Sequence, residues 1–564
     1  MLRTIDLDEA EVVSRIVKLE PRPYQVKCIS ELLAGLRKNN DTVLVLPTGM
    51  GKSAIYLPIS MVAADEGLRA CILCATNLLL DQVKQGQAPK FAHQTPLHDI
   101  KGLEHYQCQK THQKADYLFC MSNSERDLCT CGINQASFEK ERFVITNFAK
   151  FLSTPFKNKF DLIVIDDSHG FENAVEDQFQ HQVAYDRVDD LFKRHDVAGD
   201  IVGEVTGNLM DIFDDIIAAV PPSELTRRVP DDDIKKIGEI KGSEELPSTL
   251  RNLEEIDRDI YLDLFYFIKK CRDLTQNTFY VQKDFYNPLS LRDADLLSRK
   301  SDRYIDNVMR MIFGEARVLL VSAYPGKIEE HATYSTRRKH PADRIQVVPK
   351  DKPEEVKRWF RNLSLFEVTD VNDPIESGFE NCVNLTSEIL QKSKVKSLLL
   401  FKNYRDQRRA EISLKQKVKG RKITFIDDTF ETEKVQSLVE EADVIMVSAS
   451  SRLWEGINIS GLKLEIIFSL PFIRPPVYLD RTRSFPYVRR KMLVRLQQGI
   501  GRLIRDPDDR GVCVVLDYAN RPTNQTTLSN HVNSRDFSPE LRDRISQVSK
   551  DHVSEKVFES LTRG

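Results

Sequence analysis

The sequence predicts a large α/β protein that is built from several domains. A chain of 564 residues is too long for a single hydrophobic core, and about 150 residues per domain suggests three to four domains. Residues 42–46 (TVLVL) form an apolar, β-branched run that leads through a glycine turn into an apolar helical stretch, as a buried parallel strand does. Residues 161–165 (DLIVI) form a second such run and end in carboxylates, where the C-terminal edge of a parallel sheet binds ligands.

The composition is that of a globular protein, with 41% hydrophobic and 30% charged residues. No apolar run approaches the roughly 18 residues that cross a bilayer, and the start of the chain lacks the apolar core of a signal peptide. We therefore expect a cytoplasmic, nucleoid-associated protein, or a nuclear one in a eukaryote, with no membrane partner. The net charge of −3 does not exclude nucleic acid, because a groove for one strand needs only a local basic track.

A glycine-containing loop follows the first apolar run. Its glycines let backbone N–H groups turn toward phosphates, Lys52 can reach the β and γ oxygens, and Ser53 can ligate Mg²⁺. Leu46 stands where the strict motif has glycine, so a purely structural turn is the alternative reading. The predicted nucleotide-binding residues of this loop are Pro47, Thr48, Gly49, Met50, Gly51, Lys52 and Ser53.

Two carboxylates follow the second apolar run. Asp166 can hold Mg²⁺ and Asp167 can orient the attacking water. An isolated Asp-Asp pair is more often a turn or a helix cap, but the phosphate loop upstream favours the catalytic reading.

A third element, QGIGRLIR, contains Gln498, Arg502 and Arg505. The two arginines are three residues apart and would share one face if the segment were helical. Arginines so placed can neutralise charge on a γ-phosphate in the transition state. The alternative is an exposed basic helix face, which fits poorly with an apolar, glycine-interrupted segment.

Taken in order, these elements resemble those of the XPD/DinG-type DNA helicases of superfamily 2, and the resemblance covers about residues 20 to 520. RPYQ is similar to the family's adenine-proximal motif, SAY to its SAT motif, and SRLWEGINISG to its motif V. The residues that carry these matches are Arg22, Gln25, Thr76, Thr146, Ser322, Trp454, Glu455 and Gly456.

The resemblance implies an ATP- and Mg²⁺-dependent helicase that moves 5′ to 3′ on single-stranded DNA and unwinds tailed or forked duplexes, for example in DNA repair. A DNA-stimulated translocase without strand separation and an ATP-binding scaffold are the alternatives. Asp167 stands where the family's DEAH box has Glu, which predicts slower hydrolysis, and Asn458 stands where motif V often has Asp.

The implied fold has two RecA-like parallel-sheet motor domains, the first interrupted by an iron-sulfur insert and a helical Arch-like insert that could also bind a protein partner. The expected ranges are 1–100, 141–171 and 276–330 for motor domain 1, 101–140 and 172–275 for the two inserts, and 331–564 for motor domain 2.

Four cysteines lie in the first insert with the spacing C-x11-C-x8-C-x-C. Their position in the family pattern implies a [4Fe-4S] cluster held by Cys108, Cys120, Cys129 and Cys131. The spacing alone leaves a structural zinc site open. The other six cysteines are expected to be buried thiols.

Basic residues are interleaved with aromatic ones just before the third element, as expected of a segment that binds single-stranded DNA through phosphate contacts and base stacking. These residues are Arg481, Arg483, Phe485, Tyr487, Arg489, Arg490 and Lys491.

Overall fold

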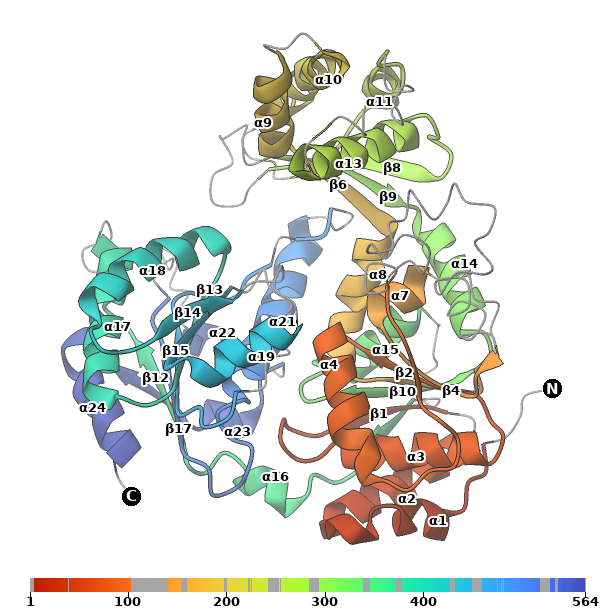
Figure 1. Ribbon diagram of the computed structural model, residues 1–564, viewed down its shortest axis with the longest axis vertical. Helices are drawn as coiled ribbons and strands as arrows, with labels where there is room; N and C mark the ends of the chain where they lie inside the picture. The colour runs from red at the N-terminus through yellow and green to blue at the C-terminus, as the bar shows by residue number, and fades with distance from the viewer. Residues whose placement is uncertain are drawn as a thin grey trace. The chain divides into compact units, whose positions relative to one another are not determined.

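A computed structural model of the chain gives the arrangement of its elements (Figure 1). It describes residues 5–562 except 39, 103–139, 154–159, 197–199, 222–223, 225, 242–252, 254, 284–293, 338–344, 372–376, 427–431, 449–458, 474, 478, 480, 518–527 and 533–535. The described chain divides into unit 1, which contains Met1–Glu172, Met311–Ile473 and Arg489–Gly564, and unit 2, which contains Asn173–Arg310 and Arg474–Val488.

Unit 1 contains a first parallel sheet of seven strands in the order β11-β1-β10-β5-β2-β4-β3. Its inner strands are apolar on both faces because helices cover both faces of a parallel sheet. The strands are β1 (Asp41–Val45), β2 (Ala70–Cys74), β3 (His98–Ile100), β4 (Phe143–Asn147), β5 (Leu162–Ile165), β10 (Arg317–Ser322) and β11 (Ile345–Val348).

Of the helices that belong to this sheet, α1 and α2 precede β1 and the others lie between strands along the chain. α2 and α3 pack against each other and against β1 and β2. The helices are α1 (Glu9–Ser14), α2 (Pro23–Arg37), α3 (Ser53–Asp65), α4 (Asn77–Asp81), α7 (Phe148–Ser153), α8 (Phe171–Phe179), α14 (Asp302–Phe313) and α15 (Ile328–Thr336), of which α8 and α14 continue into unit 2.

Unit 1 also contains a second parallel sheet of seven strands, in the order β14-β15-β13-β16-β17-β12-β18. The strands are β12 (Leu363–Val368), β13 (Ser397–Phe401), β14 (Ile423–Ile426), β15 (Val444–Ser448), β16 (Leu464–Ile467), β17 (Gly511–Val515) and β18 (Ile545–Val548).

Helices cover this second sheet as they cover the first, and α17 packs beside α24 (Figure 1). The helices of this part of the chain are α16 (Glu354–Arg358), α17 (Gly378–Ser393), α18 (Tyr404–Lys417), α19 (Thr432–Glu441), α21 (Arg481–Ile500), α22 (Leu528–Val532), α23 (Pro539–Arg542) and α24 (Lys550–Thr562), of which α21 begins in unit 2. The expectation of two parallel-sheet, RecA-like domains is confirmed.

Unit 2 combines helices with an antiparallel sheet in the order β6-β9-β8-β7. Its strands are β6 (Gln180–Ala184), β7 (Thr226–Arg228), β8 (Asn277–Gln282) and β9 (Asp295–Lys300). Its helices are α9 (Tyr185–His195), α10 (Ile201–Ala218), α11 (Asp231–Gly238) and α13 (Glu255–Cys271). Among its described residues, therefore, this segment is not purely helical.

Two of the expected ranges differ from the observed sheets. The insert expected at 172–275 continues to Arg310, because β8 and β9 pair with β7 and β6. The first sheet continues past residue 330, because β11 pairs in parallel with β1. Both differences arise from short strands whose partners lie far away in the sequence. In the described part of the chain, no helix is both long and apolar enough to cross a membrane.

Candidate active site

The phosphate loop joins the end of β1 to the start of α3, and its shape requires glycine at two positions. Gly49 has φ +85° and Gly51 has φ +74°, a region that other residues rarely adopt. A Cβ atom at Gly49 would lie 2.7 Å from the Cα of Arg505, and one at Gly51 would lie 2.5 Å from Nε2 of Gln25. The loop is therefore shaped by backbone conformation and by close neighbours on both sides.

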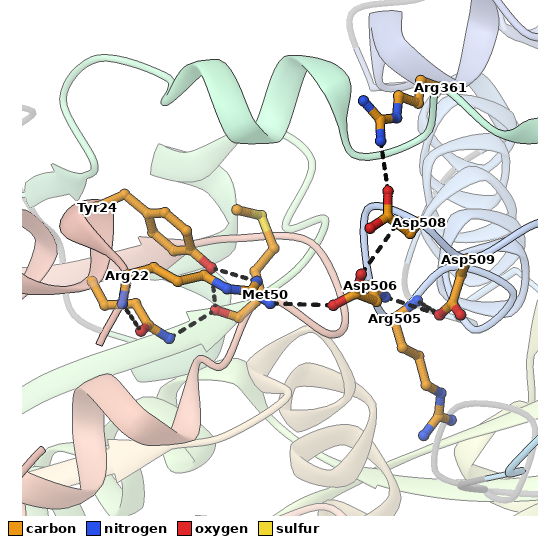
Figure 2. Close-up of polar contacts among 9 residues, drawn as sticks. Arg22, Tyr24, Met50, Arg361, Arg505, Asp506, Asp508 and Asp509 are labelled. Atoms are coloured by element: carbon orange, nitrogen blue, oxygen red, sulfur yellow. Dashed lines mark hydrogen bonds and ion pairs between the residues drawn. The ribbon is translucent and has the colours of Figure 1, made fainter. Parts of the chain in front are cut away.

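Residues of the RPYQ motif bond to the middle of this loop, at Met50 (Figure 2). The Gln25 side-chain oxygen accepts a hydrogen bond from the Arg22 backbone N–H at 2.9 Å, and its amide donates to the Met50 carbonyl at 3.3 Å. The Tyr24 hydroxyl donates to the same carbonyl at 2.8 Å. The Arg22 guanidinium lies over the Trp359 ring, 5.3 Å from its centroid. The structure thus brings Arg22 and Gln25 to the loop, and a small cavity is lined by both residues and the loop glycines.

The first acid of the acidic box, Asp166, follows β5 directly. The hydroxyl of Tyr56, a fully buried residue of α3, donates to Asp166 Oδ2 at 2.8 Å, and the Asp167 backbone N–H donates to Asp166 Oδ1 at 3.1 Å. Burial, and then the charge of Asp167, raises the pKa of Asp166 to about 7, while the nearby Lys52 opposes that shift. The Lys52 ammonium of the loop therefore acts electrostatically on this carboxyl.

The second acid, Asp167, adopts an uncommon backbone conformation, with φ 48° and ψ 47°. This left-handed region is sparsely populated by residues other than glycine, although Asp tolerates it better than most. The Gly170 backbone N–H donates to the Asp167 carbonyl at 3.1 Å, which begins a short turn. Asp167 therefore does not simply extend the strand that precedes it.

The last two residues of the acidic box connect it to distant parts of the chain. Nδ1 of His169 lies 3.4 Å from Nε2 of Gln498 and 3.5 Å from Oγ of Ser322. Ser168 Oγ and His331 Nε2 share a hydrogen bond of 2.9 Å. Tyr56, His169 and His331 were not singled out from the sequence, because only the folded chain shows their partners.

The two arginines of the third element lie beyond the end of α21, which corrects the expectation that they share a helix face. The chain turns after Ile500, with Arg502 N–H bonded to the Gly499 carbonyl at 3.1 Å. Arg502 is buried. Gly499 and Gly501 favour a turn over a continued helix at this point.

Arg505 reaches the phosphate loop through its backbone. Its N–H donates to the Asp509 carboxylate at 2.9 Å, and the Asp506 N–H donates to the same oxygen at 2.9 Å. Figure 2 shows the Arg505 side chain extending away from Asp509. Burial lowers the pKa of Arg505, and Nε of Arg505 has no hydrogen-bond partner among the described residues. A cation in such surroundings is suited to an incoming anion.

The same turn carries two exposed ion pairs (Figure 2). Arg22 lies 3.5 Å from Asp506, and Arg361 lies 2.7 Å from Asp508. Exposed pairs contribute little to stability.

Three of the basic residues expected to grip DNA have internal partners instead. Lys491 is paired with Glu172, and both side chains are buried. Arg490 is paired with Glu330, and Arg489 donates to the His531 carbonyl at 2.9 Å. For these three residues the expected phosphate contacts do not fit, because each side chain is already bonded inside the protein. Phe485, by contrast, is 55% exposed.

Several predicted residues lie outside the described part of the chain. They are Cys108, Cys120, Cys129, Cys131, Trp454, Glu455 and Gly456. The remaining cysteines, Cys28, Cys71, Cys74, Cys271, Cys382 and Cys513, are buried free thiols as predicted.

The chain has two parallel sheets. The first carries a phosphate loop and an acidic box, and a buried arginine turn from the second lies against that loop. These features define the class of nucleotide-dependent motors with two RecA-like domains. Residues 18–195 match the family model of the type III restriction enzyme res subunit, and residues 386–535 match that of the helicase C-terminal domain.

Relatives and solved structures agree with this class. The chain is 32% identical over 145 residues to the ATP-dependent DNA helicase YoaA of Escherichia coli, which covers 23% of the chain and 22% of YoaA. It is 22% identical over 605 residues to the probable ATP-dependent helicase MJ0942 of Methanocaldococcus jannaschii. That match covers 88% of this chain and 91% of MJ0942. A solved XPD helicase superimposes with a TM-score of 0.62 at 14% identity, over 94% of this chain and 99% of the other. The chain is thus similar to ATP-dependent helicases of the XPD/DinG type, although its match to YoaA spans less than a quarter of that protein.

Proposed function

We propose that this protein is an ATP-dependent DNA helicase that moves along single-stranded DNA from 5′ to 3′ and unwinds tailed or forked duplexes. The observation that carries the proposal is the seating of Arg505 against the phosphate loop, where the Cα of Arg505 leaves no room for a side chain at Gly49. An arginine that approaches the phosphates from the second sheet makes hydrolysis depend on the contact between the two sheets.

The described residues support distinct roles in hydrolysis. Lys52 would contact the β- and γ-phosphates, and Arg502 and Arg505 would neutralise the charge that develops on the transferred phosphoryl group. Asp167 would orient the attacking water. Gln498, whose Nε2 is 3.4 Å from His169 Nδ1, would position the second sheet relative to the acidic box.

The residues present fit a magnesium ion. Ser53 opens α3 beside the loop, and the Tyr56 hydroxyl fixes one oxygen of Asp166 while leaving that carboxylate further lone pairs. When bound, Mg²⁺ neutralises phosphate charge. Ser53 and Asp166 would hold it.

A [4Fe-4S] cluster on Cys108, Cys120, Cys129 and Cys131 is part of the proposal and rests on the family pattern. Anaerobic purification followed by iron, sulfide and zinc analysis tests it. About four irons per chain with broad absorbance near 400 nm would support the cluster. Zinc alone would replace it with a structural zinc site.

Turnover and strand separation test the proposed activity together. We expect the wild-type protein to hydrolyse ATP faster with single-stranded DNA and to unwind a 5′-tailed duplex, whereas Lys52→Ala does neither. Lys415→Ala is the matched control, because Lys415 makes an exposed i,i+4 pair with Glu411 on α18.

Three results would contradict parts of this proposal. No turnover in the wild type would leave an ATP-binding scaffold. Turnover without unwinding would indicate a translocase, and unwinding of only the 3′-tailed duplex would reverse the polarity.

A further inference from the structure

The acidic box of this chain departs from DEAH at two neighbouring positions. Asp167 replaces Glu, and Ser168 replaces Ala, giving the sequence DDSH. The first change shortens the acid by one methylene, or about 1.5 Å of reach. The second adds a hydroxyl that alanine lacks.

The added hydroxyl is buried and hydrogen-bonded. Ser168 is completely buried, and its Oγ shares a 2.9 Å hydrogen bond with Nε2 of His331, which is itself only 6% exposed. His331 lies on α15, the helix that follows the SAY motif. Burial, and then the Lys491 charge, lowers the pKa of His331 to about 3, so that the imidazole is neutral near pH 7 and can exchange one hydrogen bond with a hydroxyl.

The helix that carries His331 is itself fixed. Glu330, the preceding residue, is paired with Arg490 of α21. Lys491, the next residue of α21, is paired with Glu172 at the start of α8. The helix that carries His331 is therefore bonded to α21, which is in turn bonded to α8.

The second acid, which directly precedes Ser168, is the residue in the left-handed conformation. Asp167 has φ 48°, and a residue in that region needs surrounding contacts to hold it there. Ser168 follows it directly, so the position of the Ser168 side chain constrains ψ of Asp167. In the left-handed conformation, the Cβ atom of a residue also points in a different direction than it does in a helix or an extended strand.

We propose that the Ser168–His331 hydrogen bond compensates for the shortened acid by holding the left-handed turn that aims the Asp167 carboxylate. Ser168 and His331 are then positioning residues for ATP hydrolysis. The inference rests on the proposed role of Asp167 as the residue that orients water.

A double-substitution cycle tests the compensation in the full-length protein. Ser168→Ala is made alone and together with Asp167→Glu, and kcat and KM for ATP are measured with saturating single-stranded DNA and Mg²⁺. We expect Ser168→Ala alone to lower kcat about tenfold with KM unchanged within about twofold, the size expected for one lost hydrogen bond. With Asp167→Glu already present, Ser168→Ala should change kcat less than about twofold, because the longer acid no longer depends on the turn.

Variants at His331 provide an independent measurement. His331→Leu should reproduce the loss of kcat, and His331→Gln, whose amide can still bond Ser168, should recover most of it. The control is Ser387→Ala, which removes a buried hydroxyl that donates to the Val383 carbonyl at 2.8 Å within α17. It should leave kcat unchanged, and melting temperatures verify that every variant is folded.

An unchanged kcat in Ser168→Ala, or an equal loss in both acid backgrounds, would overturn the inference, since the hydrogen bond would then be only structural. Should Asp167→Glu be inactive, equal activities of His331→Leu and His331→Gln would overturn it. A wild-type protein without turnover would instead overturn the proposed function on which the inference rests.

Discussion

The phosphate loop and the acidic box follow two strands of one parallel sheet, β1 and β5, yet they are held in place differently. The loop takes its shape from positive φ at Gly49 and Gly51 and from the nearby Tyr24 and Gln25 side chains, which donate to the Met50 carbonyl. The box takes its shape from side chains that come from elsewhere, with Tyr56 bonded to Asp166 and His331 bonded to Ser168. A site held by its own backbone and by side chains close in sequence is specified locally, whereas a site held by distant side chains depends on the whole domain.

The strongest way to break the loop is to add one methyl group. Gly49→Ala places Cβ 2.7 Å from the Cα of Arg505 at φ +85°, so backbone must move. We expect ATP turnover to fall by about 100-fold or more, since a displacement near 1 Å is that costly in a catalytic site. Gly86→Ala is the control, because a Cβ there meets nothing within 4 Å. Equal activity of the two variants would show that the loop is not held by its backbone.

The strongest way to break the surroundings of the box is to remove one charge from the buried pair behind it. Lys491→Met leaves the buried Glu172 carboxylate without its cation, and we expect a loss of about 3 kcal/mol in unfolding free energy. Lys491→Met combined with Glu172→Met should recover most of that loss. Lys392→Met, which breaks an exposed pair with Glu388, should cost little. Thermal unfolding measures all three, and a double variant no more stable than the single one would count against a buried pair.

A milder change removes a single hydrogen bond from the box. Tyr56→Phe deletes the hydroxyl that donates to Asp166 Oδ2. We expect about a tenfold loss of turnover and a higher Mg²⁺ requirement, because the carboxylate loses a fixed orientation. Tyr304→Phe, on the 37% exposed Tyr304, is the control. An unchanged Mg²⁺ dependence would mean that Tyr56 only fills space.

The smallest expected effect lies in unit 2. It shows how much a side-chain hydrogen bond outside the site contributes, for comparison with those inside it. His195 Nδ1 lies 2.7 Å from Asp200, and Nε2 lies 3.2 Å from Asp257. These hydrogen bonds raise the pKa of His195 above 6.5 despite its partial burial. The stabilisation is therefore fully present below pH 6.5 and is lost as the pH rises through the folded-state pKa.

The corresponding measurement is thermal unfolding between pH 5.5 and 9. We expect the difference in melting temperature between wild type and His195→Gln to shrink by about 1 to 2 °C across the window above pH 6.5. A difference that grows with pH would reverse the assigned direction.

The same contrast explains what the sequence could predict. The strand, glycine turn and helix around Lys52 follow local rules, so the loop was predicted residue by residue. Hydrophobic periodicity likewise predicted the buried strand before Asp166. The partners of the box could not be predicted, because Ser168 and His331 are 163 residues apart and only folding brings them together.

Other differences have the same cause. α21 stops before Arg502 because glycines end it, although the spacing of the arginines suits a helix. Arg490 and Lys491 match the composition of a DNA-binding strand, but their acidic partners lie more than 150 residues away in the sequence. Local composition gives the type of a side chain and not its partner.

The most direct test of the account is ATP turnover by Arg505→Ala in the presence of single-stranded DNA, with nucleotide binding measured alongside it. We expect turnover to fall by about 1,000-fold, as for an arginine that stabilises the phosphoryl-transfer transition state, with nucleotide affinity nearly unchanged. Turnover within about threefold of the wild type would contradict it, because the contact between the arginine turn and the phosphate loop would then have no part in hydrolysis.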